Sequence, residues 1–147
     1  MDRFSPEERS RIMRTVRWKN TKPEVSVRRM LHGMGFRFRL HRRDLPGRPD
    51  IVLPRYRTVI FVNGCFWHQH SGCRKATIPQ NNRAFWEKKL MRTIERDAEN
   101  RQKLTDCGWT VITVWECEIK KSMKETMRKI VKKLQLSAQN SRIRIQK

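Results

Sequence analysis

The sequence predicts a single α/β domain in which a mixed sheet is flanked by helices. A chain of 147 residues is long enough for one domain with one hydrophobic core. Helical patterns alternate with short β-rich runs, in the order α-β-β-β-α-β-α. Hydrophobic residues make up only 37% of the chain and charged residues 33%, so we expect a small core.

Two helix-start signals open the chain. Residues 5–8 read Ser-Pro-Glu-Glu, a capping box with proline at the first helical position, and predict a short basic helix ending near Asn20. Residues 21–24, Thr-Lys-Pro-Glu, repeat the signal. The helix that follows is expected to stop near Gly33 or Gly35, and its apolar stripe consists of Val25, Val27, Met30, Leu31 and Met34.

The remaining elements follow from changes of period along the chain. Alternating or continuous β-rich runs predict strands over residues 36–40, 50–53, 58–62 and 109–114. Helical periodicity predicts helices over residues 85–104 and 121–134. The polar tail from residue 137 is expected to be disordered. The single domain therefore divides into a basic arm (1–20), a core (21–134) and a polar tail (135–147).

The charge of the chain favours a polyanionic partner. The net charge is +21 and the sequence pI is about 11.2, and between Arg9 and Arg43 Glu24 is the single acidic residue. DNA or RNA is the favoured partner, although a ribosomal-type structural protein would carry a similar charge. The first residues lack the apolar stretch of a secretory signal, so we expect a cytoplasmic protein whose four cysteines are ligands or free thiols.

The run from Gly64 to Cys73 is the most informative stretch of the chain. Cys65, His70 and Cys73 offer three metal ligands within nine residues, and Cys117 can supply a fourth from the end of a distant strand. Such a set favours a structural tetrahedral zinc site over a metal-free loop. His68 is a spare ligand that a closed site does not need. Cys107, beside a glycine at a helix end, is expected to pack rather than bind metal.

Aromatic residues lie inside this loop and at the start of a later helix. Phe66 and Trp67 have little room to be buried together in a metal-bound loop, so they are the better candidates to stack on or wedge between bases. Phe85 and Trp86 open a helix and are compatible with either a core or a DNA-facing role.

A second constellation suits a carboxylate-based nuclease. Asp50 starts a strand just after a turn, and the neighbouring strand would deliver Asn63 to the same end of the sheet, toward which Glu24 could also point. Carboxylates of this kind bind Mg²⁺. His68 could exchange protons at neutral pH. By itself Asp50 is better explained as a turn or cap residue, and Glu24, more strongly still, as the N3 position of its own capping box.

Several short motifs occur in an order that points to one family of nucleases. They are residues 20–24 (NTKPE), 45–52 (LPGRPDIV), 59–68 (VIFVNGCFWH), 85–86 (FW) and 114–117 (VWEC). This ordered set, over about residues 5–120, resembles the very-short-patch-repair DNA mismatch endonucleases, the Vsr family. The resemblance implies a restriction-endonuclease-like fold and a Mg²⁺-dependent nick on the 5′ side of the thymine in T:G mismatches that arise when 5-methylcytosine is deaminated.

The resemblance also implies a role for each matching residue. Asp50 would be the principal Mg²⁺ ligand, His68 the catalytic histidine and Glu24 a supporting acid. The structural zinc would be bound by Cys65, His70, Cys73 and Cys117. An aromatic wedge beside the mismatch would come from Phe66, Trp67 and Trp86, and the basic arm, with Arg14, Arg17 and Lys19, would clamp phosphates.

One position departs from the family pattern. Asn63 stands where well-known members carry a histidine, and an asparagine cannot exchange a proton at neutral pH. It can still donate a hydrogen bond to a phosphate or a metal-bound water. Two alternatives therefore stay open beside the repair enzyme: a restriction-type or nonspecific nuclease of the same fold, and a catalytically silent zinc DNA-binding module. In every case we expect a monomer that is associated with the bacterial nucleoid through DNA. Mismatch-repair proteins are candidate partners.

Overall fold

The computed structural model describes residues 21–145 and contains one four-stranded sheet in the strand order β1-β2-β3-β4. β1 pairs antiparallel with β2 and β2 antiparallel with β3, whereas β3 and β4 are parallel, so the sheet is mixed. The strands are β1 (Arg39–Leu40), β2 (Ile51–Leu53), β3 (Thr58–Asn63) and β4 (Thr110–Trp115). The mixed α/β architecture expected from the sequence is confirmed.

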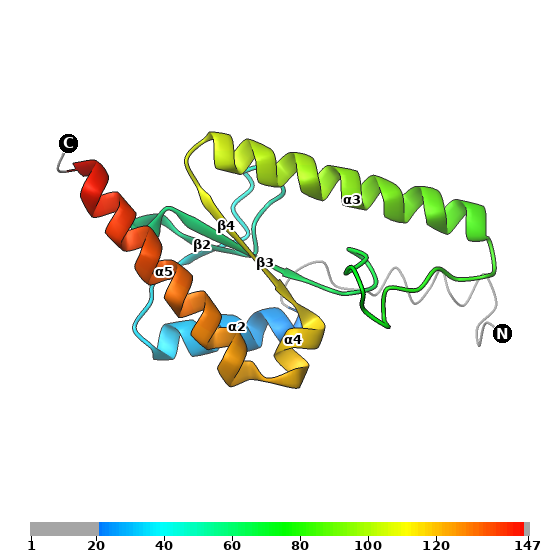
Figure 1. The fold of residues 1–147 in the computed structure, drawn as a ribbon, viewed down its shortest axis with the longest axis horizontal. Coiled ribbons are helices and arrows are strands. Elements are labelled where there is room, and N and C mark those ends of the chain that lie inside the picture. The colour runs from blue at the N-terminus through cyan, green and yellow to red at the C-terminus, as the bar shows by residue number, and fades with distance from the viewer. Residues whose placement is uncertain (1–20, 146–147) are drawn as a thin grey trace.

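Helices cover both faces of this sheet (Figure 1). α2 (Lys22–Gly33) and α5 (Met123–Ile145) lie on one face, and the long α3 (Arg83–Asp106) lies on the other. The short α4 (Glu116–Lys121) follows β4 directly. The fold therefore has three layers, with the sheet between two layers of helices, an arrangement typical of sheets with parallel strands.

The core follows from the two-residue period of the strands. Ile51 and Leu53 point toward α2 and α5, while Val52 between them points toward α3, and all three are fully buried. The larger cluster also takes in Val27, Leu31, Ile60, Ile112, Val114, Met127, Ile130 and Leu134. The smaller cluster combines Val52 and Val59 with Leu104 of α3. Burial on both faces explains why β2 and β3 read as continuous apolar runs.

The strand directions bring three chain segments to one end of the sheet. Parallel pairing sets Asn63 at the end of β3 beside Trp115 at the end of β4. Because β2 runs antiparallel to β3, its start lies at this same end, with Asp50 directly before it. The register therefore places Asp50 at the same end of the sheet as the Cys/His loop that begins after Asn63.

Two expectations about secondary structure need correction, and a third is not tested. Only Arg39–Leu40 of the expected strand over 36–40 pairs with β2, whereas Phe36 and Phe38 pack against the larger core cluster. The expected helix over 121–134 begins instead at Met123, after Ser122 has ended α4 in an extended conformation. The expected basic helix before residue 21 lies outside the described residues.

The tail from residue 137 is helical rather than disordered, since α5 continues to Ile145. Ser137 is buried, and its hydroxyl donates to the Thr110 hydroxyl at 3.3 Å and accepts from the Thr58 hydroxyl at 3.4 Å. The polar composition was misleading because this serine packs through hydroxyl contacts with the sheet. It satisfies buried hydrogen-bonding groups there.

Candidate functional site

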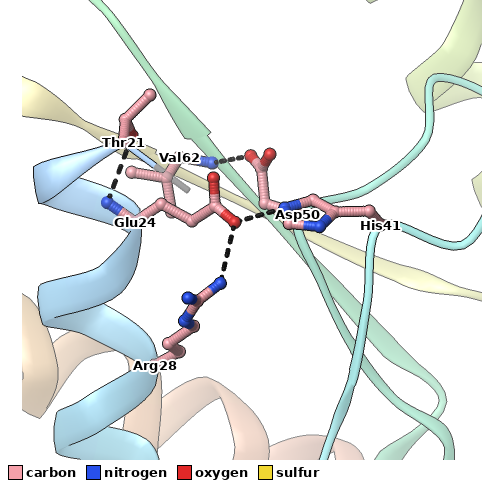
Figure 2. A network of polar contacts seen from close by, with 6 residues as sticks. All are labelled: Thr21, Glu24, Arg28, His41, Asp50 and Val62. Carbon is pink, nitrogen blue, oxygen red and sulfur yellow. Dashed lines mark hydrogen bonds and ion pairs between the residues drawn. The ribbon is translucent and has the colours of Figure 1, made fainter. Parts of the chain in front are cut away.

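Two carboxylates and a histidine meet at the end of the sheet (Figure 2). One ligand atom each from Glu24, His41 and Asp50 lies within 4.8 Å of the others. The Asp50 carboxylate is held in place because its Oδ2 accepts a hydrogen bond from the backbone N–H of Val62 at 2.7 Å. The expected meeting of Glu24 and Asp50 is therefore present in the structure.

Glu24 serves the helix and the site together. Its backbone N–H donates to the Thr21 side chain at 3.4 Å, so it occupies the N3 position that the sequence indicated. Its side chain is nonetheless turned inward and only 1% exposed. The carboxylate contacts the His41 ring and an Arg28 guanidinium nitrogen at 3.5 Å. Such partners are what a buried carboxylate requires.

His41 was not singled out from the sequence. It follows β1 directly, and its backbone N–H donates to the Asp50 carbonyl oxygen at 3.3 Å, which extends the β1–β2 ladder by one bond. Its φ of 47° lies in the left-handed region, an uncommon conformation for a residue with a Cβ. The available signal was its position in the sequence, directly after β1, the strand that pairs with β2, which itself follows Asp50.

The surroundings of Asp50 raise the pKa of its carboxyl group from 3.8 to about 7. Burial is the largest cause, and the nearby Glu24 carboxylate adds to it. The hydrogen bond from Val62 and the positive character of His68 act in the opposite direction. A carboxylate that is costly to ionise without a counter-charge is the kind of group that a cation stabilises.

His68 lies on the other side of Asn63 and is oriented by a residue that sequence reasoning missed. Its Nδ1 is 2.6 Å from Oδ2 of Asp97 on α3. Asp97 stands seven residues from each of the buried Leu90 and Leu104, so an acidic residue on the inward face of α3 was the available signal.

A small cavity of about 60 Å³ separates α3 from the sheet here, and Asn63, His68 and Asp97 are among its lining residues. Asn63 is buried at its edge. An imidazole fixed through Nδ1 by a carboxylate leaves Nε2 as the nitrogen that can exchange a proton with water or a substrate. His68 is also near enough to Asp50 for its charge to lower the pKa of that carboxyl group.

The four sulfur and nitrogen ligands expected from the sequence are brought together. One ligand atom each of Cys65, His70, Cys73 and Cys117 lies within 4.8 Å of the others. Nδ1 of His70 is 3.3 Å from the sulfur of Cys117 and 3.8 Å from that of Cys65. Bonds of about 2.0–2.3 Å place the ligand atoms of a tetrahedral zinc roughly 3.5 Å apart, which this spacing fits.

The surroundings of this group hold its histidine in place. The His70 ring stacks on Trp115 with centroids 4.1 Å apart and an interplanar angle of 9°. Cys117 comes from the first turn of α4, just past the end of β4, as the sequence indicated. Cys107 lies outside the group, but it is exposed at the end of α3 and not packed as expected.

The aromatic residues form one cluster between the Cys/His loop and the start of α3. Phe66, Trp67 and Trp86 have ring centroids 5.1–6.1 Å apart, and Phe85 is 5.6 Å from Trp86. Trp86 is buried, whereas Phe66 and Trp67 are half-buried and Phe85 is 58% exposed. Trp86 thus supports the other rings in the free protein, and the exposed Phe85 is the member that sequence reasoning left undecided.

The expected phosphate contacts of the basic arm are not tested by the structure. Arg14, Arg17 and Lys19 lie outside the described residues. No helix in the described part of the chain combines the length and apolarity needed to cross a membrane.

Comparison with known proteins identifies relatives along most of the chain. A sequence profile of the family described as DNA mismatch endonuclease Vsr matches residues 1–75. The Type II nicking enzyme V.XorIIP of Xanthomonas oryzae pv. oryzae is 51% identical over 118 residues, which cover 80% of this chain and 86% of the relative.

Two further relatives extend this similarity. The Type II nicking enzyme V.NmeAIP of Neisseria meningitidis is 43% identical over 135 residues, covering 90% of this chain and 96% of the relative. The DNA mismatch endonuclease Vsr of Escherichia coli is 38% identical over 127 residues, covering 86% of this chain and 81% of the relative. Both alignments are long enough to include the carboxylate pair, the Cys/His group and the aromatic cluster.

Proposed function

Because the chain belongs to the Vsr family of DNA mismatch endonucleases, enzymes that cleave phosphodiester bonds, we propose that it nicks duplex DNA 5′ of the thymine in T:G mismatches, with Mg²⁺ as cofactor. The observation that carries the proposal is the pairing of Asp50 with Glu24 at one end of the sheet, near enough to the His68–Asp97 pair for His68 to affect the pKa of Asp50. The metal loop and the aromatic cluster adjoin this end.

The donor set at Asp50 fits a hard divalent cation. Asp50 and Glu24 offer carboxylate oxygens, the ligands that Mg²⁺ takes when it binds through one or two carboxylates and a substrate phosphate. When bound there, Mg²⁺ would stabilise the charge that develops on the phosphate and lower the pKa of an attacking water. The Val62 N–H keeps the Asp50 carboxylate aimed at this position.

The proton steps are assigned to the chain's own side chains. We assign to Nε2 of His68 the removal of a proton from the attacking water, or its transfer to the leaving oxygen when the P–O bond breaks. Asp97 holds the ring through Nδ1, so it fixes the tautomer in which Nε2 is the exchanging nitrogen. Asn63 can donate a hydrogen bond to a phosphate oxygen but takes no part in proton transfer.

The aromatic cluster supplies a route to mismatch selectivity. A mismatched step is easier to unstack than a paired one, so an aromatic side chain inserted beside it costs less there. Phe66 and Trp67 are half-exposed on a loop that the Cys/His group would hold rigid when it binds Zn²⁺. Trp86, buried beneath them, keeps the pair from collapsing into the core.

The remaining parts of the proposal follow from charge and family. The net charge of +21 suits duplex DNA, and the basic arm with Arg14, Arg17 and Lys19 is assigned to phosphate contacts. We assign the chain a restriction-endonuclease-like fold, supported by its mixed sheet with carboxylates at one end. Action as a monomer on chromosomal DNA, alongside mismatch-repair proteins, completes the proposal.

Two other functions use the same residues and differ in the products they predict. A restriction-type or nonspecific nuclease of this fold would cut both strands of matched DNA. A silent zinc DNA-binding module, suggested by Asn63 in place of histidine, would bind DNA tightly in a salt-sensitive manner without cutting it. The family membership and the intact Asp50–His68 arrangement favour the mismatch nickase over both.

The test is cleavage of end-labelled duplexes that differ only in one T:G or C:G pair, each in Mg²⁺ and in EDTA, across several flanking sequences. We expect a nick in the T:G duplex with Mg²⁺ alone. Equal cutting of the matched duplex would favour the nuclease, and tight binding with no cutting in any divalent metal would favour the silent binder.

A further inference from the structure

We propose that His41 is a third protein ligand of the cation held by Asp50 and Glu24, and that the site therefore binds a first-row transition-metal cation more tightly than Mg²⁺. The inference rests on the proposed function, since it concerns the cation of that same site. It adds a nitrogen ligand to a centre otherwise described by carboxylates alone. It is carried by the place and surroundings of His41.

The His41 ring is inside the site and not beside it. Figure 2 shows the imidazole reaching the Glu24 carboxylate next to Asp50, and the three ligand atoms lie within 4.8 Å of one another. The His41 side chain is 14% exposed and that of Glu24 1% exposed. Ligand atoms this close, on largely enclosed side chains, are arranged around one small volume.

The backbone holds His41 in an uncommon conformation to put it there. The hydrogen bond from its N–H to the Asp50 carbonyl oxygen couples the two residues across the β1–β2 ladder. The chain then turns through a left-handed conformation at His41, with φ of 47°, which a residue bearing a Cβ adopts at some cost. Conformations of this kind persist where the surroundings over-determine them, and they cluster at active sites and ligand clamps.

The donor set decides which cation the site prefers. Mg²⁺ selects oxygen ligands and retains several waters, whereas imidazole nitrogen suits first-row transition metals. Two carboxylates and one imidazole therefore gain little with Mg²⁺ and more with a transition-metal ion.

A competing role for His41 is to hydrogen-bond Glu24 and nothing more. That role would make it a positioning residue, and its replacement would alter the binding of every cation alike. A ligand role instead predicts a loss confined to the transition metal, together with a direct nitrogen signal from the bound ion.

The experiment uses the full chain loaded with one equivalent of zinc, enough to fill the Cys/His group and leave the Asp50 site open, and Mn²⁺ as the probe. Electron paramagnetic resonance of free Mn²⁺ gives the Mn²⁺ affinity, and competition gives the Mg²⁺ affinity. Spin-echo modulation at the bound Mn²⁺ reports a directly coordinated imidazole nitrogen. His41→Gln keeps a hydrogen-bond donor for Glu24 but removes the imidazole. His32→Gln is the matched control, because His32 is exposed in the last turn of α2.

We expect the wild type to bind Mn²⁺ at least ~10-fold more tightly than Mg²⁺ and to show the nitrogen signal. His41→Gln should lose that signal and weaken Mn²⁺ binding by ~10-fold or more, with Mg²⁺ affinity within about twofold. His32→Gln should match the wild type, and Asp50→Asn should weaken both cations.

Three results would overturn the inference. They are the absence of a nitrogen signal in the wild type, its persistence in His41→Gln, and an equal loss of Mn²⁺ and Mg²⁺ in that variant. Each can occur while the wild type still nicks a T:G duplex, in which case the inference fails and the proposed function stands. A chain with the expected metal binding but no mismatch nicking would separate the two in the opposite direction.

Discussion

Replacing Asp50 by asparagine should stabilise the protein when no cation occupies the Asp50 site, while abolishing its cleavage activity. Burial and the Glu24 carboxylate raise the pKa of Asp50 from 3.8 to about 7, so the ionised side chain is costly in the folded state. Since one pKa unit corresponds to about 1.4 kcal/mol, holding Asp50 ionised costs ~4 kcal/mol. Asparagine removes the charge, and its side-chain oxygen can still accept the Val62 hydrogen bond.

The pH dependence gives this prediction its sign. Between pH 3.8 and about 7 the folded wild type retains a proton on Asp50 that the unfolded chain has lost. The wild type therefore loses stability as the pH rises through this window, whereas Asp50→Asn has no proton to lose there. The advantage of the variant should be small at pH 4, grow by ~4 kcal/mol up to pH 8, and stay constant above that.

The assay is urea unfolding of the zinc-loaded proteins at half-unit pH intervals, without Mg²⁺ or chelator. Groups that titrate equally in both proteins cancel in the difference. Asp44→Asn is the matched control, because Asp44 is exposed and the guanidinium of Arg42 lowers the pKa of its carboxyl group. It should show no rising advantage with pH. A constant difference between wild type and Asp50→Asn from pH 4 to pH 8 would refute the reasoning.

Three more predictions concern the metal loop, the proton-transfer pair and the aromatic cluster. Cys117→Ser should lose its zinc by metal analysis and be destabilised by ~4 kcal/mol or more in urea unfolding. The control Cys107→Ser should keep both its zinc and its stability. Full zinc content in Cys117→Ser would refute the assignment. Asp97→Asn should slow single-turnover nicking by ~100-fold or more because the histidine it holds loses its fixed tautomer, and Asp106→Asn, exposed on the same helix, should nick at the wild-type rate. Trp67→Ala should lower the T:G preference over matched duplex by ~10-fold in competition binding, with unchanged preference contradicting the wedge.

Much of the site could be predicted because local spacing carries its chemistry. Cys65, His70 and Cys73 are close in sequence, so their meeting needed only one loop, and the parallel β3–β4 pair then brings Cys117 to them. Asp50 was predictable as well, because antiparallel pairing of two adjacent strands puts the start of one beside the end of the other.

The missed residues depend on packing between distant elements. Asp97 reaches its histidine because α3 crosses the face of the sheet, and nothing in its local sequence gives that crossing. His41 reaches the site through a left-handed turn that short-range patterns do not encode. Trp86 was predicted as a wedge residue and its role stays a prediction, but its burial beside Phe66 and Trp67 in the free protein depends on how α3 meets the loop.

Helix and strand limits were wrong where tertiary contacts decide them. The tail after residue 137 has the composition of a disordered segment, but α5 continues to Ile145, and Ser137 is buried in contact with Thr58 and Thr110. Of the expected strand over 36–40, only residues 39 and 40 pair with β2, whereas Phe36 and Phe38 pack against the core.

We propose that residues at the Asp50 end of the sheet cleave one DNA strand at a T:G mismatch, and mapping the position of the nick tests this proposal. Each strand of a T:G duplex is end-labelled in turn and incubated with Mg²⁺ and either wild type or Asp50→Asn, with duplex binding measured in parallel. We expect one wild-type product, ending directly 5′ of the mismatched thymine, and no product from the variant at comparable DNA affinity. Cutting of both strands, or nicking by Asp50→Asn at the wild-type rate, would contradict the claim.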